Sequence, residues 1–180
     1  MSTLITTLSA WTGFAVFFLY AGLFEYAFHR WVLHHRWRLI PHPYQVHTFL
    51  HHRVFRGDAA DQVRQEEDRD PILFEWWQGP LLLAVHVPLV WGAQVVSGFP
   101  LFWGGMTALA AYYGFYEYLH WCMHTPVGRW IERTRVFRSL DARHRLHHQR
   151  WRMNFNVVLP IGDFLFGTFR PGIRLHTPSG

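Results

Sequence analysis

The stretch that decides the fold is Leu4–Phe24, LITTLSAWTGFAVFFLYAGLF, which runs directly into Glu25–His35, EYAFHRWVLHH. Leu4–Phe24 carries no charge, and a helix of that length spans about 30 Å, the thickness of the hydrocarbon core of a bilayer. The residues before it lack the basic region of a signal peptide, so we expect an uncleaved membrane anchor. The first charges and the first histidines follow immediately after this span.

A second apolar region covers residues 79–116 and is interrupted by Ser-Gly-Phe-Pro at 97–100. Glycine and proline mark a turn, so the region predicts a helical hairpin with apolar arms at about 79–97 and 99–116. Each arm is close to the minimum length of a helix that crosses a bilayer. The lengths therefore fit either a full crossing or a hairpin that enters the membrane and returns.

The composition excludes several classes of protein. Half of the 180 residues are hydrophobic and 18% are aromatic, which excludes a disordered chain. Cys122 is the single cysteine, which excludes a disulfide scaffold, an iron–sulfur cluster and a cysteine zinc finger. All 17 basic residues are arginine and they do not form one basic tract, so we expect no nucleic-acid partner.

The arginines also predict an orientation. Every arginine lies in residues 25–78 or 117–180, and none lies before the first span or in the 97–100 turn. By the positive-inside rule, both arginine-bearing segments are cytoplasmic and the turn is outside. The absence of lysine is typical of a GC-rich bacterial genome, which points to a bacterial inner membrane.

Ten of the fourteen histidines form four clusters on the predicted cytoplasmic side, within residues 29–52 and 120–148. Two histidines four residues apart on a helix lie on one face, so both rings can reach one ion. His29 and His34 are five apart, so the helix must bend or end there, or the two rings serve different metals. The clusters are His29-x4-His34, His47-x3-His51-His52, His120-x3-His124 and His144-x2-His147-His148.

Ten imidazoles exceed what one ion binds, whereas two ions can share them and keep open positions. Imidazole suits iron, zinc, copper and nickel, so the ligands alone do not name the metal. A two-metal site at a membrane surface, surrounded by aromatic residues, favours oxidative chemistry on a lipid. The isolated His42, His86 and His176 are expected to be ordinary polar or interfacial residues.

The four clusters, in this order and split by a hydrophobic hairpin, resemble the fatty acid hydroxylase/sterol desaturase superfamily. The tail Asn154-Phe155-Asn156 followed by PIGDFLFGT at 160–168 resembles the closing motif of that family. The resemblance covers about residues 24–169. Asn156 departs from it, because the family more often has glycine there.

The resemblance implies an all-α integral membrane protein with a single domain over residues 1–180, whose cytoplasmic helical cap holds a histidine-ligated dimetal site. It also implies an enzyme that uses O2 and two iron ions, with zinc able to replace iron in purified protein, to hydroxylate a lipid. His35 is a weaker, additional candidate ligand. The ligands carried over are His29, His34, His47, His51, His52, His120, His124, His144, His147 and His148.

Four polar residues are candidates for orienting the ligands. Glu25 precedes His29 by one helical turn, and Glu117 precedes His120 in the same way. A carboxylate that accepts the far ring N–H of a ligand fixes its tautomer, although either residue could instead pair with an arginine. Asn154 and Asp163 match positions of the family motif and would orient ligands or cap the last segment.

We expect a fatty-acyl chain as the substrate, with sterol desaturation and carotenoid hydroxylation as alternatives of the same chemistry. A metal transporter is an alternative from another class, but it should hold its ligands at mid-membrane, where only His86 lies. A protein that has lost its activity is a third alternative. The complete histidine clusters argue against it, since none of them lacks a histidine. Since the chain has no attached redox domain, the expected partners are the lipid, the membrane and a separate electron donor of the cytochrome or ferredoxin type.

Overall fold

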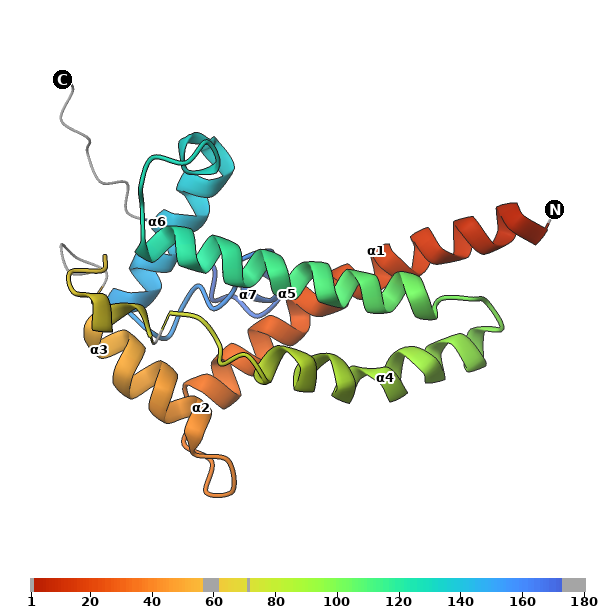
Figure 1. Ribbon diagram of the computed structural model, residues 1–180, viewed down its shortest axis with the longest axis horizontal. Helices are drawn as coiled ribbons and strands as arrows, with labels where there is room; N and C mark the ends of the chain where they lie inside the picture. Colours follow the sequence, from red (N-terminus) through yellow and green to blue (C-terminus); the bar gives the residue numbers. More distant parts are fainter. Residues whose placement is uncertain (1, 57–61, 71, 173–180) are drawn as a thin grey trace.

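The computed structural model describes residues 2–56, 62–70 and 72–172, and every regular element in that part of the chain is helical. Three long helices extend together to one side, and the shorter helices gather at their other end (Figure 1). The α-helices are α1 (Ser2–Phe28), α2 (His42–Tyr44), α3 (His52–Val54), α4 (Gln78–Ser97), α5 (Phe102–His124), α6 (Arg135–Gln149) and α7 (Ile161–Leu165). The π-helical segments are His29–Leu33 and Gln45–His51, and short 3-10 turns cover Glu66–Arg69 and Ile131–Arg133.

Helix α1 crosses α5 at a close contact between small residues. A Cβ atom added to Gly104 would lie 1.9 Å from the carbonyl oxygen of Ala10, so only glycine allows this approach. Along the same contact, Phe17, Leu109 and Tyr112 are buried in one apolar cluster. Small residues at a crossing let two helix backbones pack closely where no hydrophobic effect drives them together.

Helices α4 and α5 form the predicted hairpin. Gly98 ends α4 in the left-handed conformation, with φ of 71°, and its N–H donates to the carbonyl oxygen of Gln94 at 3.0 Å. Glycine adopts this conformation without a steric penalty, which is why the helix can end and reverse here. The hairpin prediction is confirmed.

Two helical stretches are long and apolar enough to cross a membrane, Thr3–Leu33 and Gln78–Ser97. Only 22% and 17% of their most apolar windows are buried, so most of their side chains face outward, as lipid-facing helices require. Most of the predicted third span at 99–116 lies in α5, which begins at Phe102, and no further helix among the described residues meets the same test. The last turns of α5 carry Glu117, His120 and His124, which face the interior of the protein.

The shorter helices pack across the inner end of the hairpin and α1. Thr134 caps α6, because its side chain accepts a hydrogen bond from the N–H of Phe137 at 3.1 Å. Helix α7 packs directly on α1, where a Cβ atom on Gly162 would lie 2.3 Å from Cβ of Tyr26. This packing brings α7 beside the end of the first span, close to His29, the first histidine in the chain.

Candidate metal centre

The structure divides the ten cluster histidines into two groups of five. Within each group, one ring nitrogen from every histidine lies within 4.8 Å of the others. We call them the first group, His29, His34, His47, His52 and His147, and the second group, His51, His120, His124, His144 and His148. Their use as ligands stays a prediction, but all ten positions converge on two sites, as a two-metal centre requires.

The π-helical segments explain the five-residue spacings. The N–H of His34 donates to the carbonyl oxygen of His29 at 3.2 Å, an i→i+5 bond, and the two rings stack at 5.1 Å. His47 and His52 repeat this arrangement in the next segment, where their Nε2 atoms are 3.2 Å apart. The bend required of the 29–34 segment is therefore a local π-helix, a form of helix often found at functional sites.

One pair at four-residue spacing does not share a site. His47 belongs to the first group and His51 to the second, although both lie on one π-helical segment and their rings are 5.2 Å apart. The pairs His120/His124 and His144/His148, on regular α-helices, each stay within the second group. A shared helix face thus brings two rings close without deciding which site each one joins.

The two groups adjoin each other in the interior. The ring of His52, from the first group, stacks on the ring of His148, from the second, at 4.3 Å. His51 and His147 have no exposed surface, and the ring of Phe55 lies 4.1 Å from that of His124. The groups therefore form one buried centre from which bulk water is largely excluded.

Backbone carbonyls fix the tautomer of three histidines. Nδ1 of His147 donates to the carbonyl oxygen of Met153 at 2.8 Å, and Nδ1 of His148 donates to that of Phe55 at 2.6 Å. Nδ1 of His29 bonds the carbonyl oxygen of Phe155 in the same way. Because Nδ1 carries the proton in each neutral ring, Nε2 presents a lone pair to the centre, which is the form that binds a metal.

His34 has the same tautomer for a different reason. The hydroxyl of Thr48 donates to the carbonyl oxygen of Leu33 at 2.7 Å, so its oxygen accepts the Nδ1–H of His34 at 3.2 Å. Nε2 of His34 and Nε2 of His147 then face each other at 3.0 Å, and neither carries a proton. Two lone pairs at this distance repel each other unless a cation lies between them.

Burial keeps these rings neutral at pH 7. Burial and the neighbouring His147 ring lower the pKa of His34 to about 2, and burial lowers the pKa of His147 to about 4. In the same direction, burial lowers the pKa values of His47, His51, His52, His144 and His148. Neutral imidazole is the form of histidine that binds metal, so the electrostatics of the centre fit metal binding.

The spacing of the nitrogens fits a metal as well. Nε2–Nε2 distances within the groups include 2.9 Å for His29/His47 and 3.1 Å for His124/His144. Two nitrogens about 2.1 Å from one ion and at right angles to each other are separated by about 3.0 Å. The residues present therefore fit two metal ions, one in each group.

Glu25 and Asp163 hold the chain segment that orients His29. Asp163 accepts the backbone N–H groups of Phe155 and Asn156 at 2.9 and 2.8 Å, and Glu25 accepts that of Val157 at 2.5 Å. The segment fixed in this way supplies the carbonyl oxygen of Phe155 to His29. The sequence left open whether Glu25 contacts a histidine ring or pairs with an arginine. In the structure its carboxylate accepts from Tyr112, Asn156 and Val157, so it acts on His29 through the backbone.

Glu117 also differs from the prediction. Its carboxylate accepts the N–H of Phe74 at 3.2 Å, a contact that ties the segment before α4 to α5. The hydrogen bonds given for Glu117 run to the backbone N–H of Phe74 and not to a histidine ring. The expected pairing with an arginine is also replaced by this backbone contact.

Asn154 and Asn156 also hold this segment in place, through hydrogen bonds of their side chains. Asn154, with φ of 54°, accepts the N–H of Arg170 at 2.7 Å and donates to the carbonyl oxygen of Arg143 at 3.3 Å. Asn156 donates to the carbonyl oxygen of Gly22 at 2.7 Å and to Glu25 at 3.0 Å. Its side chain therefore supplies two bonds to α1 that the glycine more usual at this position could not make.

Three further histidines of the described residues lie outside both groups. His35 is exposed beside Trp37, His42 pairs with Glu75 at 3.3 Å, and the buried His86 packs against Phe24 with its Nδ1 bonded to the carbonyl oxygen of Leu82. The expectation that His35 is a weaker candidate agrees with this placement. His176 lies outside the described residues.

The atoms that set the histidine tautomers could not be identified from the sequence. The carbonyl oxygens of Phe55, Met153 and Phe155 leave no signature in the sequence, since every residue has one. Thr48, one residue after His47, and Tyr112, whose hydroxyl donates to Glu25 at 2.5 Å, belong to no spacing pattern that would have singled them out.

Comparison with known proteins agrees with this geometry. A search of curated proteins and a search of solved structures gave no match. The family model described as "Fatty acid hydroxylase" matches residues 14–168, which include all ten histidines of the two groups. This family of membrane enzymes and the two apolar spans together point to a membrane protein. With most of its length matched, from the first span to the segment that orients His29, the chain belongs to the fatty acid hydroxylase family.

Proposed function

We propose that the protein is a membrane-bound oxygenase that hydroxylates a lipid, with a fatty-acyl chain as the substrate. The family is one of hydroxylase- and desaturase-type oxidoreductases that act on lipids. The observation that carries the proposal is the pair of adjoining five-histidine groups, which include no carboxylate from the part of the chain that the structure describes. The buried position of this pair, directly beyond two apolar helices, supports a lipid as the substrate.

The histidines would hold two iron ions, one in each group, and zinc could replace iron in purified protein. Iron supplies the redox chemistry that activates O2 toward an unreactive C–H bond. The contribution of the chain is to present Nε2 lone pairs in a fixed arrangement. The Nδ1 hydrogen bonds of His29, His147 and His148 hold those rings in the metal-binding tautomer before any metal arrives.

Burial is the second contribution of the chain. His51 and His147 have no exposed surface, and Phe55 covers His124. Excluding water protects a reactive oxidant from side reactions and leaves the apolar substrate as the available reaction partner.

Electrons would come from a separate protein of the cytochrome or ferredoxin type. The sequence contains one cysteine, Cys122, so it cannot itself bind an iron–sulfur cluster through four thiolates. The arginine-bearing segments around the histidines would face the cytoplasm, where such donors are found. Sterol desaturation and carotenoid hydroxylation would use the same centre with a different lipid.

A metal transporter is less well supported by the arrangement of the ligands. The histidines gather beyond the end of α1, in the last turns of α5 and on α6, and backbone carbonyls hold the rings of His29, His147 and His148. A transporter needs ligands that release the ion along a path through the membrane. The four fixed tautomers and the burial of nine of the ten histidines favour a resident metal instead.

The function can be tested by expressing the protein with a reductase and an electron donor under ¹⁸O2 and analysing the cell lipids by mass spectrometry. We expect a lipid heavier by one ¹⁸O atom, which identifies both the substrate and the source of the oxygen. The product should disappear in His148→Ala and persist in His35→Ala, which alters a histidine outside both groups. Metal exported or accumulated without any oxidised lipid would instead support transport.

A further inference from the structure

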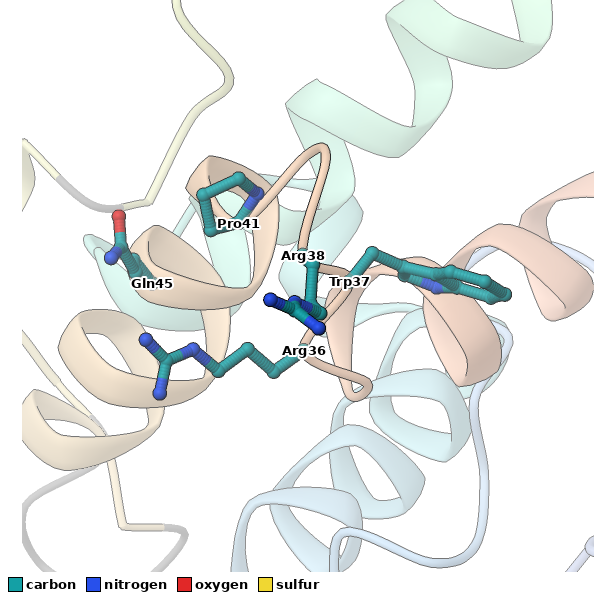
Figure 2. Close-up of a pocket in the computed structure, with 5 residues that line it drawn as sticks. All are labelled: Arg36, Trp37, Arg38, Pro41 and Gln45. Atoms are coloured by element: carbon teal, nitrogen blue, oxygen red, sulfur yellow. The ribbon is translucent and has the colours of Figure 1, made fainter.

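A second candidate site lies outside both histidine groups. A cavity of about 460 Å³ opens where the 34–41 loop meets the second π-helical segment, and five residues line it (Figure 2). They are Arg36, Trp37, Arg38, Pro41 and Gln45. Figure 2 shows Arg36 reaching toward the side of Gln45, while Trp37 points away in the opposite direction.

The two arginines give this cavity a positive charge without a counter-ion. Among residues 2–56, 62–70 and 72–172, no Asp or Glu side chain forms an ion pair with Arg36 or Arg38. By contrast, Arg129 and Arg145 are paired with Glu132 and Asp141. Two guanidinium groups that line one cavity without a described acidic partner attract an anion, and their planar donors match the oxygens of a phosphate.

Exposed apolar residues lie next to the two arginines in the chain. Leu39 is 95% exposed, and its neighbour Ile40 and the aromatic Trp31 are also exposed. The loop begins where the first candidate span, Thr3–Leu33, ends. Tryptophan, arginine and exposed aliphatic residues at the end of a span are typical of the membrane interface, where lipid phosphates lie.

We propose that this cavity binds the phosphate of an anionic phospholipid. Arg36 and Arg38 hold the phosphate, the amide of Gln45 supplies a further donor, and Leu39 and Ile40 contact the acyl chains. Free phosphate would use the guanidinium groups but not the exposed aliphatic residues, so the lipid makes use of the whole site. The proposal depends on the membrane location of the loop and is independent of the reaction at the histidines.

The test is native mass spectrometry of the full chain in detergent, titrated with dioleoyl phosphatidylglycerol and, separately, with dioleoyl phosphatidylcholine. We expect the first phosphatidylglycerol to bind at least tenfold more weakly to Arg36→Gln/Arg38→Gln than to the unaltered protein. A matched control, Arg135→Gln/Arg138→Gln, removes two positive charges from α6 and should bind the lipid normally. In Arg36→Lys/Arg38→Lys the affinity should be intermediate, because the charge remains but the paired donors do not.

Metal content measured on the same samples shows that each variant is folded. Equal phosphatidylglycerol binding by the Gln variant and the α6 control would overturn the proposal, as would equal affinity of the unaltered protein for phosphatidylcholine. Displacement of the lipid by an equal concentration of inorganic phosphate would assign the cavity to free phosphate and would also overturn it.

Discussion

Nε2 of His34 and Nε2 of His147 face each other at 3.0 Å, and both rings carry their proton on the other nitrogen. One ring follows the first membrane-span candidate, and the other lies on α6, more than one hundred residues later. Because burial lowers both pKa values, to about 2 and about 4, no proton bridges the pair at pH 7. The contact is therefore repulsive in the absence of a cation, and it becomes favourable when a metal ion binds both nitrogens.

His34→Ala should reduce bound metal from about two ions per chain to about one, because it removes a nitrogen from the first group only. His35→Ala is the matched control: the adjacent histidine is exposed, belongs to neither group and should leave the metal content unchanged. Inductively coupled plasma mass spectrometry on purified, folded protein gives the ratio. Equal loss in the two variants would contradict the grouping.

His47→Ala and His51→Ala should each remove a different ion, although the two residues are four apart on one segment. The double variant should then lose both ions, and its metal content should fall to near zero. Retention of one full ion by the double variant would mean that the two rings serve the same site. The measurement is metal content per chain, with the double variant compared against each single one.

Acid should destabilise the metal-free protein between about pH 6.5 and pH 4. The unfolded chain binds a proton on His147 near its ordinary pKa of 6.5, whereas burial lowers the folded pKa to about 4. The unfolded state therefore gains protons first as the pH falls, and the free energy of unfolding drops by up to about 3 kcal/mol from this group. Unfolding temperatures at a series of pH values measure the effect, and His147→Gln should show a shallower slope; an equal slope would assign the pH dependence to other groups.

Asp163→Asn should destabilise the protein by about 1–3 kcal/mol, because the amide cannot accept from both Phe155 N–H and Asn156 N–H while keeping the bond from Thr168. Glu25→Gln should have a similar effect through Val157. Both variants should also lower metal affinity, since the segment that orients His29 loosens. Thermal unfolding and a metal titration check this, with the exposed Glu67→Gln as a control expected to match the unaltered protein.

Cysteines introduced at Ser97 and at Glu67, in a background with Cys122 replaced by alanine, should react with a membrane-impermeant reagent from opposite sides. Ser97 ends α4, whereas Glu67 lies in the short turn before it, so full crossing by α4 separates them. Glu67 is expected on the cytoplasmic side because of the surrounding arginines. Reaction of both positions from one side would show that the α4–α5 hairpin enters the membrane and returns.

The sequence alone determined the elements of this protein. The uncharged run at 4–24 predicts a span, and the break at 97–100 predicts the hairpin, because hydropathy and turn chemistry act over neighbouring residues. The histidine spacing singled out ten residues, and the structure brings those ten together. The third span at 99–116 stays a prediction: α5 provides the helix, but it is not among the two stretches of the described residues that are apolar enough by hydropathy alone.

Only the tertiary structure decided how the ten histidines divide. His47 and His51 look like one pair in the sequence but join different groups, and His34 meets His147 across the fold. The tautomers depend on carbonyl oxygens of Phe55, Met153 and Phe155, which any residue type could supply. The physical reason is that residue type sets which atoms are able to bind a metal. Their convergence on one point depends on the packing of distant helices, and this information is not local in the sequence.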